Sequence, residues 1–386
     1  MFSAPVAAVT DPKSVVRLVL RQFPLPEIHA ALQATGKHEK RQRLLPAALV
    51  VQLVICLCLL RDAASRVVLA YLVSGKLASK MAITKARYRL GARPLIELFR
   101  RLAKPLATVA SVPAAFYGGL RLTAIDGTTV DVPDTPQNEA VFGRPGSSRG
   151  KAAFPRARVI TLCECGTHVM LAARVRPYLR DEMTAVCDII RRDVAAGMLV
   201  LIDRGLCFAH SVALIVARGA HVLGRVKSNI ALPQLAIHPD GSWLSRMGET
   251  AVRAIRYQVV SGDTIAEFTV VTTLLDWREH PALELAQLYH ERWEIETAFD
   301  EIKTHQQGRP NGQATLIRAQ LPAGVVQEIY AMLVAHTFLR TLMGAAALER
   351  GVDPDRISFK TTLNIVRAHL VNIANASPEQ LAPLFS

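Results

Sequence analysis

Apolar residues recur every three or four positions through the first hundred residues, a spacing typical of amphipathic helices. This pattern predicts helix-length segments at 13–23, 25–35, 45–60, 64–73, 76–82, 84–89 and 94–104. Gly91 breaks the pattern before the last of them, and a linker rich in Ala, Pro and Gly follows at 105–119. We therefore predict an all-helical domain over residues 1–105.

From residue 120 onward the apolar runs become short, as they are in strands. Strands are predicted at 120–125, 157–164, 168–176, 199–202 and 221–226, and helices at 180–196 and 209–218. Residues 127–150 contain several Pro and Gly residues and are predicted to form a polar loop. Three neighbouring strands followed by strand–helix units are the order of a ribonuclease-H-like fold, an α/β fold with a mixed sheet flanked by helices.

The rest of the chain, from residue 227 onward, divides into three parts. Residues 227–275 have a residue pattern typical of strands, which predicts a β-rich insertion. One long helix is predicted at 282–306, so the catalytic domain is predicted to comprise 120–226 and 276–320. Further helices at 323–344 and 356–374 predict a helical C-terminal region over 321–386.

Positive charge is concentrated in the predicted N-terminal domain. Residues 1–105 hold 18 Lys and Arg against 5 Asp and Glu, whereas the rest of the chain holds 28 against 27. A genome rich in G and C would raise basicity along the whole chain, and the near-neutral remainder argues against that explanation. Such asymmetry is typical of a nucleic-acid-binding arm ahead of a catalytic body. The basic residues around Gly91 fit either a helix-turn-helix motif or a solvated helical face.

The cysteines and the longest apolar run bear on where the protein works. None of the six cysteines forms a C-x-x-C pair, so we predict buried, reduced thiols with neither zinc nor a disulfide. The apolar run at 44–60 is at the lower limit for crossing a bilayer and contains Pro46 and Gln52. A buried core helix is the favoured interpretation, and a membrane span is the alternative. We therefore expect no membrane partner and a cytoplasmic, nucleoid-associated location.

Two aspartates follow apolar strands. Asp126 comes after the strand at 120–125, and Asp203 comes after the strand at 199–202. Ligands gather at the carboxyl ends of strands in open α/β sheets, and adjacent parallel strands would bring both carboxylates together there. Paired carboxylates suit Mg²⁺, and two-metal sites carry out phosphodiester chemistry. Each aspartate alone is equally well explained as a turn or a helix cap.

The predicted helix at 282–306 carries a polar ridge beside its apolar stripe. At about 100° per residue, one narrow stripe collects four apolar residues, Leu288, Ile295, Phe299 and Ile302. Beside it, within an arc of about 60°, lie Tyr289, Arg292, Glu296 and Lys303. A carboxylate that faces a metal, flanked by cations that face phosphates, explains this composition. The alternative is a surface helix with charge pairs, which suits the Arg292–Glu296 spacing but not the Glu296–Lys303 spacing.

These residues carry a family resemblance. The spacing Tyr289-x2-Arg292-x3-Glu296-x6-Lys303 resembles the signature of bacterial insertion-sequence transposases of the DDE type, in the group named after insertion sequence four. The segments around Asp126 and Asp203 resemble the first and second acidic blocks of that group. The N-terminal hundred residues are similar to its helical N-terminal domain, and the resemblance covers about residues 12–340.

The resemblance implies roles for the site residues. It implies that three catalytic carboxylates, Asp126, Asp203 and Glu296, bind two Mg²⁺ (or Mn²⁺) ions. It also implies that Tyr289, Arg292 and Lys303 grip phosphates at the transposon tip. The partners would be double-stranded DNA, as terminal inverted repeats and as target DNA, with a homodimer on the paired ends. One strand is nicked, the freed 3′ hydroxyl attacks, and the excised end joins target DNA.

An aromatic residue near the site is also implied. Related members hold a flipped base on an aromatic ring, which offsets the cost of unstacking. The strand at 267–273 carries Phe268 where some relatives have Trp, and Trp293 is a second candidate.

Two other functions remain open from the sequence. The chain could be an inactive DNA-binding remnant that represses at element ends, or a stand-alone nuclease of ribonuclease-H type. The three carboxylates favour chemistry, and the basic arm with the β insertion favours a transposase over a simple nuclease.

Overall fold

The structure is a computed structural model that describes residues 25–39, 41, 43–73, 77–147, 150–261, 264–306 and 317–375. The helix predicted at 13–23 lies outside these residues.

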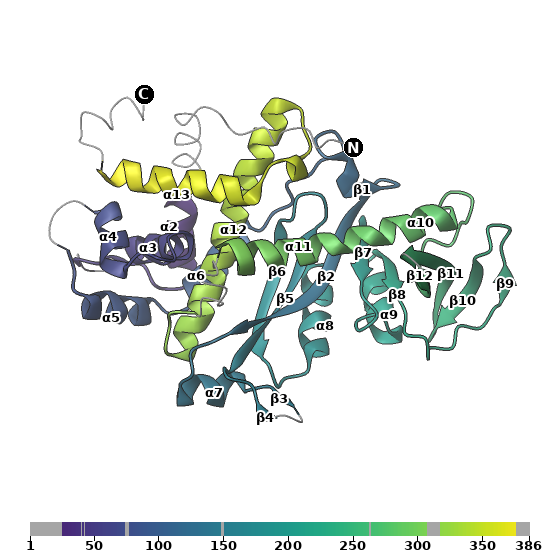
Figure 1. The fold of residues 1–386 in the computed structure, drawn as a ribbon, viewed down its shortest axis with the longest axis horizontal. Coiled ribbons are helices and arrows are strands. Elements are labelled where there is room, and N and C mark those ends of the chain that lie inside the picture. Colours follow the sequence, from purple (N-terminus) through teal and green to yellow (C-terminus); the bar gives the residue numbers. More distant parts are fainter. Residues whose placement is uncertain are drawn as a thin grey trace.

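A mixed sheet of ten strands forms the centre of the molecule (Figure 1). Its strands run in the order β6 (Met170–Pro177), β5 (Arg156–Glu164), β2 (Leu120–Asp131), β7 (Met198–Ile202), β8 (His221–Arg225), β12 (Thr264–Thr272), β11 (Thr250–Ser261), β10 (Trp243–Met247) and β9 (Ala236–Ile237), and the short β1 (Phe116–Tyr117) pairs with β2 beside this series. β2, β5 and β6 are antiparallel neighbours, whereas β7 and β8 run parallel to β2. This mixed arrangement confirms the predicted ribonuclease-H-like fold.

The predicted β-rich insertion continues the same sheet. β12 pairs antiparallel with β8, and β11, β10 and β9 follow outward. Without β12, one side of β8 would expose unpaired backbone groups along a sheet edge. The insertion therefore reaches the carboxyl end of β8, next to the residues that follow β7. Its limits as a separate domain remain a prediction.

Helices cover both faces of the sheet. On one face, α8 (Glu182–Asp193) contacts β5 and β6, and α9 (Ala209–Ala217) contacts β8. On the other face, α11 (Trp293–Asp300) contacts β2, and α12 (Pro322–Arg350) contacts β6. Each face encloses its own apolar core.

The N-terminal helices pack around α12. They are α2 (Leu25–Ala34), α3 (Ala47–Leu59), α4 (Ser65–Leu72), α5 (Lys80–Leu90) and α6 (Arg93–Leu102). The apolar run at 44–60 forms α3, which is buried along most of its length against α12, so a core helix is confirmed. α12 itself is long and apolar enough to cross a membrane, and 78% of its apolar window is buried inside the protein. All six cysteines are buried, as predicted for core residues.

Two predictions of local structure in the first half of the chain are wrong. The segments at 76–82 and 84–89 are not two helices: α5 is a single helix, because the Ser79 hydroxyl caps it by accepting from the Ala82 N–H at 3.2 Å. The loop predicted at 127–150 contains the last third of β2, the short helix α7 (Pro136–Phe142) and the short strands β3 (Gly146–Ser147) and β4 (Gly150–Lys151).

The helix predicted at 282–306 changes its winding three times. It consists of α10 (Ala282–Leu288), the 3₁₀ segment η2 (Tyr289–Arg292), α11 and the π-helical segment η3 (Glu301–Gln306). Different windings turn side chains by different angles per residue, so the ridge expected from one ideal helix is broken at both ends. The last elements of the described residues are the 3₁₀ turn η5 (Pro354–Arg356) and α13 (Phe359–Asn375). A similar turn, η1 (Pro113–Ala115), precedes the sheet.

Candidate active site

The parallel pairing of β2 and β7 sets Asp126 and Asp203 side by side. The last paired residues are Ile125 and Ile202, and each aspartate is the next residue in the chain. Both strands are largely apolar and buried just before this point, as expected in the middle of a sheet. The two segments are thus adjacent and parallel as expected, and Asp203 follows its strand, whereas Asp126 lies within β2 and not at its end.

The two aspartates differ in their backbone surroundings. β7 ends before Asp203, whose Oδ1 accepts from the N–H groups of Gly205 (2.9 Å) and Leu206 (3.0 Å) and so closes a turn. β2 continues beyond Asp126, so the expectation that a loop begins there is wrong. It continues because β5 pairs with it as far as Asp131. Asp126 is therefore held in a strand, and its Oδ1 accepts from the Gly127 N–H at 2.7 Å.

A fourth carboxylate, Glu182, lies beside this strand. A side-chain carbon at Gly127 would lie 2.3 Å from Glu182 Oε1, so glycine allows the first residue of α8 to approach the sheet. Glu182 also pairs with Arg158 on β5 at 3.1 Å. Sequence reasoning missed Glu182, because its approach depends on how α8 packs.

Glu296 is linked to Asp126 through Arg292. Arg292 Nη2 donates to Glu296 Oε1 at 2.7 Å, and its Nη1 lies 3.5 Å from Asp126 Oδ2. Arg292 is only 8% exposed, and its guanidinium lies between the two carboxylates. α11 thus turns Glu296 toward β2, on the side where both aspartates lie.

The electrostatics of Asp126 reflect crowded negative charge. Burial raises the pKa of Asp126 to about 6, and the charges of Asp203 and Glu296 add to the rise. The Gly127 N–H and Arg292 oppose it without cancelling it. Three carboxylates whose charges disfavour one another offer only oxygen ligands, the donor set that Mg²⁺ and Mn²⁺ prefer. The residues present therefore fit divalent metal ions.

Tyr289 and Lys303 do not form one open ridge with Arg292. Tyr289 is buried, and its hydroxyl donates to the Ile202 carbonyl at 3.2 Å, which ties η2 to the end of β7. Burial also raises the pKa of Tyr289, so the phenol stays protonated at neutral pH. Lys303 lies on η3, half-buried, and lines a small apolar cavity with Thr128 of β2.

A hollow beside the carboxylates brings several aromatic rings together. This cavity of about 1030 Å³ is lined by residues that include Asp203, Arg225, Tyr257, Phe268, Tyr289 and Trp293. Trp293 is 52% exposed, and the Arg292 guanidinium lies 5.0 Å from its ring centroid. Both aromatic candidates, Phe268 and Trp293, thus lie on one hollow that reaches Asp203.

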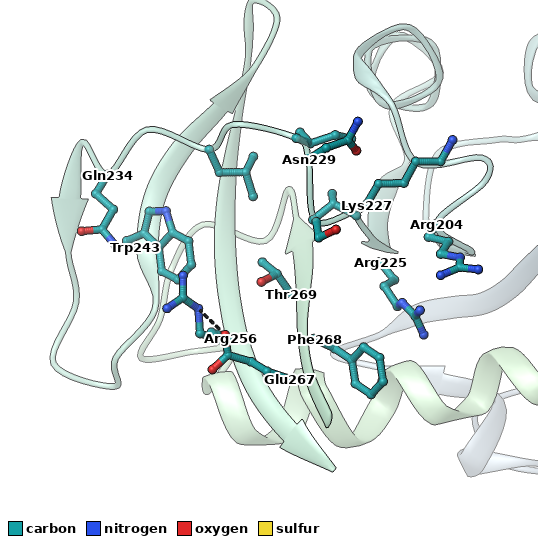
Figure 2. A pocket seen from close by; sticks show the side chains of 14 residues that line it. Arg204, Arg225, Lys227, Asn229, Gln234, Trp243, Arg256, Glu267, Phe268 and Thr269 are labelled. Atoms are coloured by element: carbon teal, nitrogen blue, oxygen red, sulfur yellow. Dashed lines mark ion pairs between the residues drawn. The ribbon is translucent and has the colours of Figure 1, made fainter. Parts of the chain in front are cut away.

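A second, basic hollow adjoins the first on the insertion (Figure 2). The two share Arg204, Arg225 and Phe268, and the second, of about 730 Å³, adds Lys227, Trp243 and Arg256. In Figure 2, Arg204, Arg225 and Lys227 lie at the right and Trp243 with Arg256 at the left.

Guanidinium groups cover aromatic rings along this basic hollow. Arg225 lies over the Phe268 ring at 4.3 Å and Arg256 over the Trp243 ring at 5.6 Å, and Arg256 also pairs with Glu267. The sequence singled out Phe268 but not the other residues of this basic hollow, because the hollow forms only when β12 pairs with β8.

Comparisons with known proteins bear on this site. Residues 117–334, which contain all three carboxylates, match a family model described as "Transposase DDE domain", and residues 13–100 match one described as "Insertion element 4 transposase N-terminal". "Transposase InsG for insertion sequence element IS4" of Escherichia coli (strain K12) is 24% identical over 379 residues, which cover 92% of this chain and 83% of that protein.

Two further matches cover less or share less sequence. "Putative transposase InsZ" of the same strain is 27% identical over 198 residues, which cover 50% of this chain and 65% of that protein. A cryo-EM structure of a piggyBac transposase synaptic complex with hairpin DNA covers 97% of this chain and 84% of its own, at 9% identity and a TM-score of 0.47.

Proposed function

This chain belongs to the DDE transposase family, with the N-terminal region of the insertion element 4 transposases, and from that premise we propose a cut-and-paste reaction carried by Asp126, Asp203 and Glu296. The protein is a transposase, an enzyme that cleaves and joins DNA. The observation that supports these three residues is their convergence: two follow the last β2–β7 pair, and the third shares a guanidinium with the first.

The family implies a divalent metal ion, and we propose two ions of Mg²⁺ or Mn²⁺. Asp126, on β2, and Asp203, directly after β7, would hold them from the sheet, and Glu296 would hold them from α11. Ions bound there supply activation of the attacking oxygen and stabilisation of the leaving oxygen. Ligands on a central strand, in the turn directly after its neighbour and on a packed helix keep this geometry better than ligands on long loops would.

Arg292 and Tyr289 have different proposed parts around the carboxylates. Arg292 would position Asp126 and Glu296 and offer its remaining donors to a phosphate, a role that suits its planar fork. Tyr289 would anchor η2 on Ile202 and so fix the position of Arg292 at the end of η2. Lys303, on η3 after the end of α11, lines a cavity with Thr128 and would place its charge near the DNA end.

The basic hollow on the insertion is the proposed path of a DNA strand. Arg204, Arg225, Lys227 and Arg256 present cations that suit backbone phosphates, beside the half-buried ring of Phe268, which is an aromatic partner for an unstacked base. Phe268 and Trp293 would take the base-holding role near Asp203. The basic N-terminal helices would read the terminal repeats, two copies would pair the two ends, and the protein would act at the nucleoid.

One assay separates this proposal from the two other functions. The purified chain is incubated with a plasmid that carries the element ends, a target plasmid and Mg²⁺. Cut-and-paste transposition gives cleaved ends and joined products. A stand-alone nuclease gives nicks without joined products, and a repressor remnant gives a DNA complex without nicks. Either of those two results rejects the proposal.

Replacing Lys227 tests the strand path. We expect Lys227→Ala to weaken binding of DNA ends at every sequence and to lower the slope of log affinity against log salt by about 1, because one phosphate contact is lost. Affinity is measured between low and moderate salt. Lys360→Ala, which removes an exposed lysine on α13, serves as the matched control. An unchanged slope in the Lys227 variant removes this residue from the DNA path.

Replacing the Tyr289 hydroxyl separates anchoring from phosphate binding. Tyr289→Phe loses the bond to the Ile202 carbonyl, and we expect the free energy of unfolding to fall by about 1 kcal/mol. Denaturant unfolding measures this change, and end affinity is measured in parallel. Weaker end binding with unchanged stability would instead mean that the hydroxyl contacts DNA directly.

A further inference from the structure

A second group of metal-ligating side chains lies on the opposite side of α11 from Glu296. Glu294 comes two residues earlier, which is about 200° around a helix. Its carboxylate accepts from the Gly166 N–H at 3.3 Å, in the turn between β5 and β6. His168, in the same turn, and Asp355 of η5 complete the group. None of these three residues belongs to the proposed catalytic site.

The three ligand atoms are close enough to surround one ion. His168 Nε2 lies 2.5 Å from Glu294 Oε2 and 3.6 Å from Asp355 Oδ1. The ligand atoms of all three residues lie within 4.8 Å of one another. Among the described residues, this is the group of His, Cys, Asp and Glu side chains whose ligand atoms are that close together. The His168 backbone adopts φ 55°, and its ring is only 4% exposed.

The groups behind the ligands are arranged as in metal sites. His168 Nδ1 lies 3.2 Å from Glu301 Oε1, and Glu301 accepts from His336 Nε2 and Arg340 Nε at 2.9 Å each. A carboxylate that accepts the far N–H of a histidine fixes the ring with its other nitrogen toward a metal. Arg340 Nη2 also contacts Nδ1, and because a guanidinium can only donate, this contact favours the tautomer in which Nδ1 accepts. Metal binding at Nε2 requires the other tautomer, with Nδ1–H donating to Glu301.

Charge counting also favours a cation here. The cluster holds three carboxylates, Glu294, Glu301 and Asp355, and one guanidinium, Arg340. With both histidines neutral, two negative charges remain uncompensated in a largely buried place, which is unfavourable. One divalent cation restores neutrality. Protons on the imidazoles or on the carboxylates are the competing way to balance the charge.

We propose that His168, Glu294 and Asp355 bind a structural transition-metal ion of the Zn²⁺ class. One imidazole and two carboxylates suit Zn²⁺, whereas the all-oxygen set at Asp126 suits Mg²⁺. Asp355 is exposed, so the ion can enter from solvent and keep a water as its fourth ligand. The ion would tie the β5–β6 turn and η5 to α11, the helix that carries Glu296. This assignment does not depend on the proposed function.

Co²⁺ binding by the full chain tests the proposal, because Co²⁺ replaces Zn²⁺ and absorbs visible light according to its coordination. The wild-type chain, stripped of metal, should bind one equivalent of Co²⁺ with a low-symmetry visible spectrum in addition to any Co²⁺ at the catalytic carboxylates, and Zn²⁺ should displace it. Asp355→Asn, at an exposed position, should weaken binding at least tenfold, and His168→Gln should abolish it. Glu301→Gln should weaken it about 10- to 100-fold.

The double variant Asp126→Asn, Asp203→Asn is the matched control and should keep the Co²⁺ spectrum. Loss of the spectrum in this control, with retention in Asp355→Asn, would place the ion at the catalytic carboxylates and overturn the proposal. Absence of Co²⁺ binding by the wild type would also overturn it, since protons on the imidazoles or on the carboxylates would then balance the charge. A transposase that proves inactive with DNA leaves the Co²⁺ result unaffected.

Discussion

Asp203→Asn is expected to abolish cleavage of transposon ends while the protein still folds and binds DNA. The amide keeps an oxygen that can accept from Gly205 and Leu206, so the turn after β7 is retained. It loses the negative charge, and a neutral amide is a poor ligand for a hard divalent cation. A loss of about 10³-fold or more in cleavage rate is expected, which corresponds to about 4 kcal/mol of transition-state stabilisation.

Single-turnover cleavage of an end-bearing duplex in Mg²⁺ measures this loss, and end affinity is measured in Ca²⁺. The control is Asp62→Asn, which makes the same chemical change at an exposed aspartate beyond α3. Cleavage by Asp203→Asn within tenfold of the wild-type rate would mean that Asp203 only closes its turn. The metal assignment would then be wrong, whatever the DNA affinity.

The pair of aspartates was predictable because its signal is local. Each apolar run ends at an acidic residue, and the order of strands and helices makes the two runs parallel neighbours. The continuation of β2 to Asp131 was not predictable in the same way. Its residues are stabilised by pairing with β5, about thirty positions away in the chain, while their own polar character favours a loop.

The interrupted helix shows a second limit of sequence patterns. Apolar periodicity finds a helical segment but cannot separate α, 3₁₀ and π winding over a few residues. The winding here follows tertiary contacts, since Tyr289 bonds to β7 and Glu301 bonds to α12. The basic hollow also depends on contacts between residues far apart in the chain, because β12 brings Phe268 beside Arg225. The positions of the three carboxylates were predictable, whereas the surfaces around them were not.

Glu328 joins the N-terminal helices to α12 through buried charges. Its carboxylate, 2% exposed, pairs with Arg61 at 2.6 Å and Arg87 at 3.3 Å, and it accepts from the Arg318 N–H at 3.0 Å. Arg61 follows α3 and Arg87 lies on α5, so one carboxylate of α12 compensates cations from two other elements. The placement of the basic N-terminal helices beside the catalytic sheet therefore depends on this residue.

Glu328→Ala is expected to lower the free energy of unfolding by about 3–5 kcal/mol, because removing one partner leaves buried guanidinium groups without a counter-charge. Denaturant unfolding at pH 7 measures the change. Glu349→Ala, which truncates an exposed glutamate near the end of the same helix, is the control and should cost less than about 1 kcal/mol. A Glu328 variant as stable as this control would mean that water compensates the arginines.

The pH dependence of the same network provides an independent test. Burial alone would raise the pKa of Glu328, but the charges of Arg87 and Arg61 lower it below its ordinary value of 4.5. A lowered pKa in the folded state means that the carboxylate contributes its full stabilisation above about pH 4.5 and loses it as the pH falls through the folded pKa. The stability difference between wild type and Glu328→Gln should therefore be constant near neutral pH and shrink in acid. A difference that grows in acid would show that Glu328 is protonated in the folded protein at neutral pH and that the arginines are balanced elsewhere.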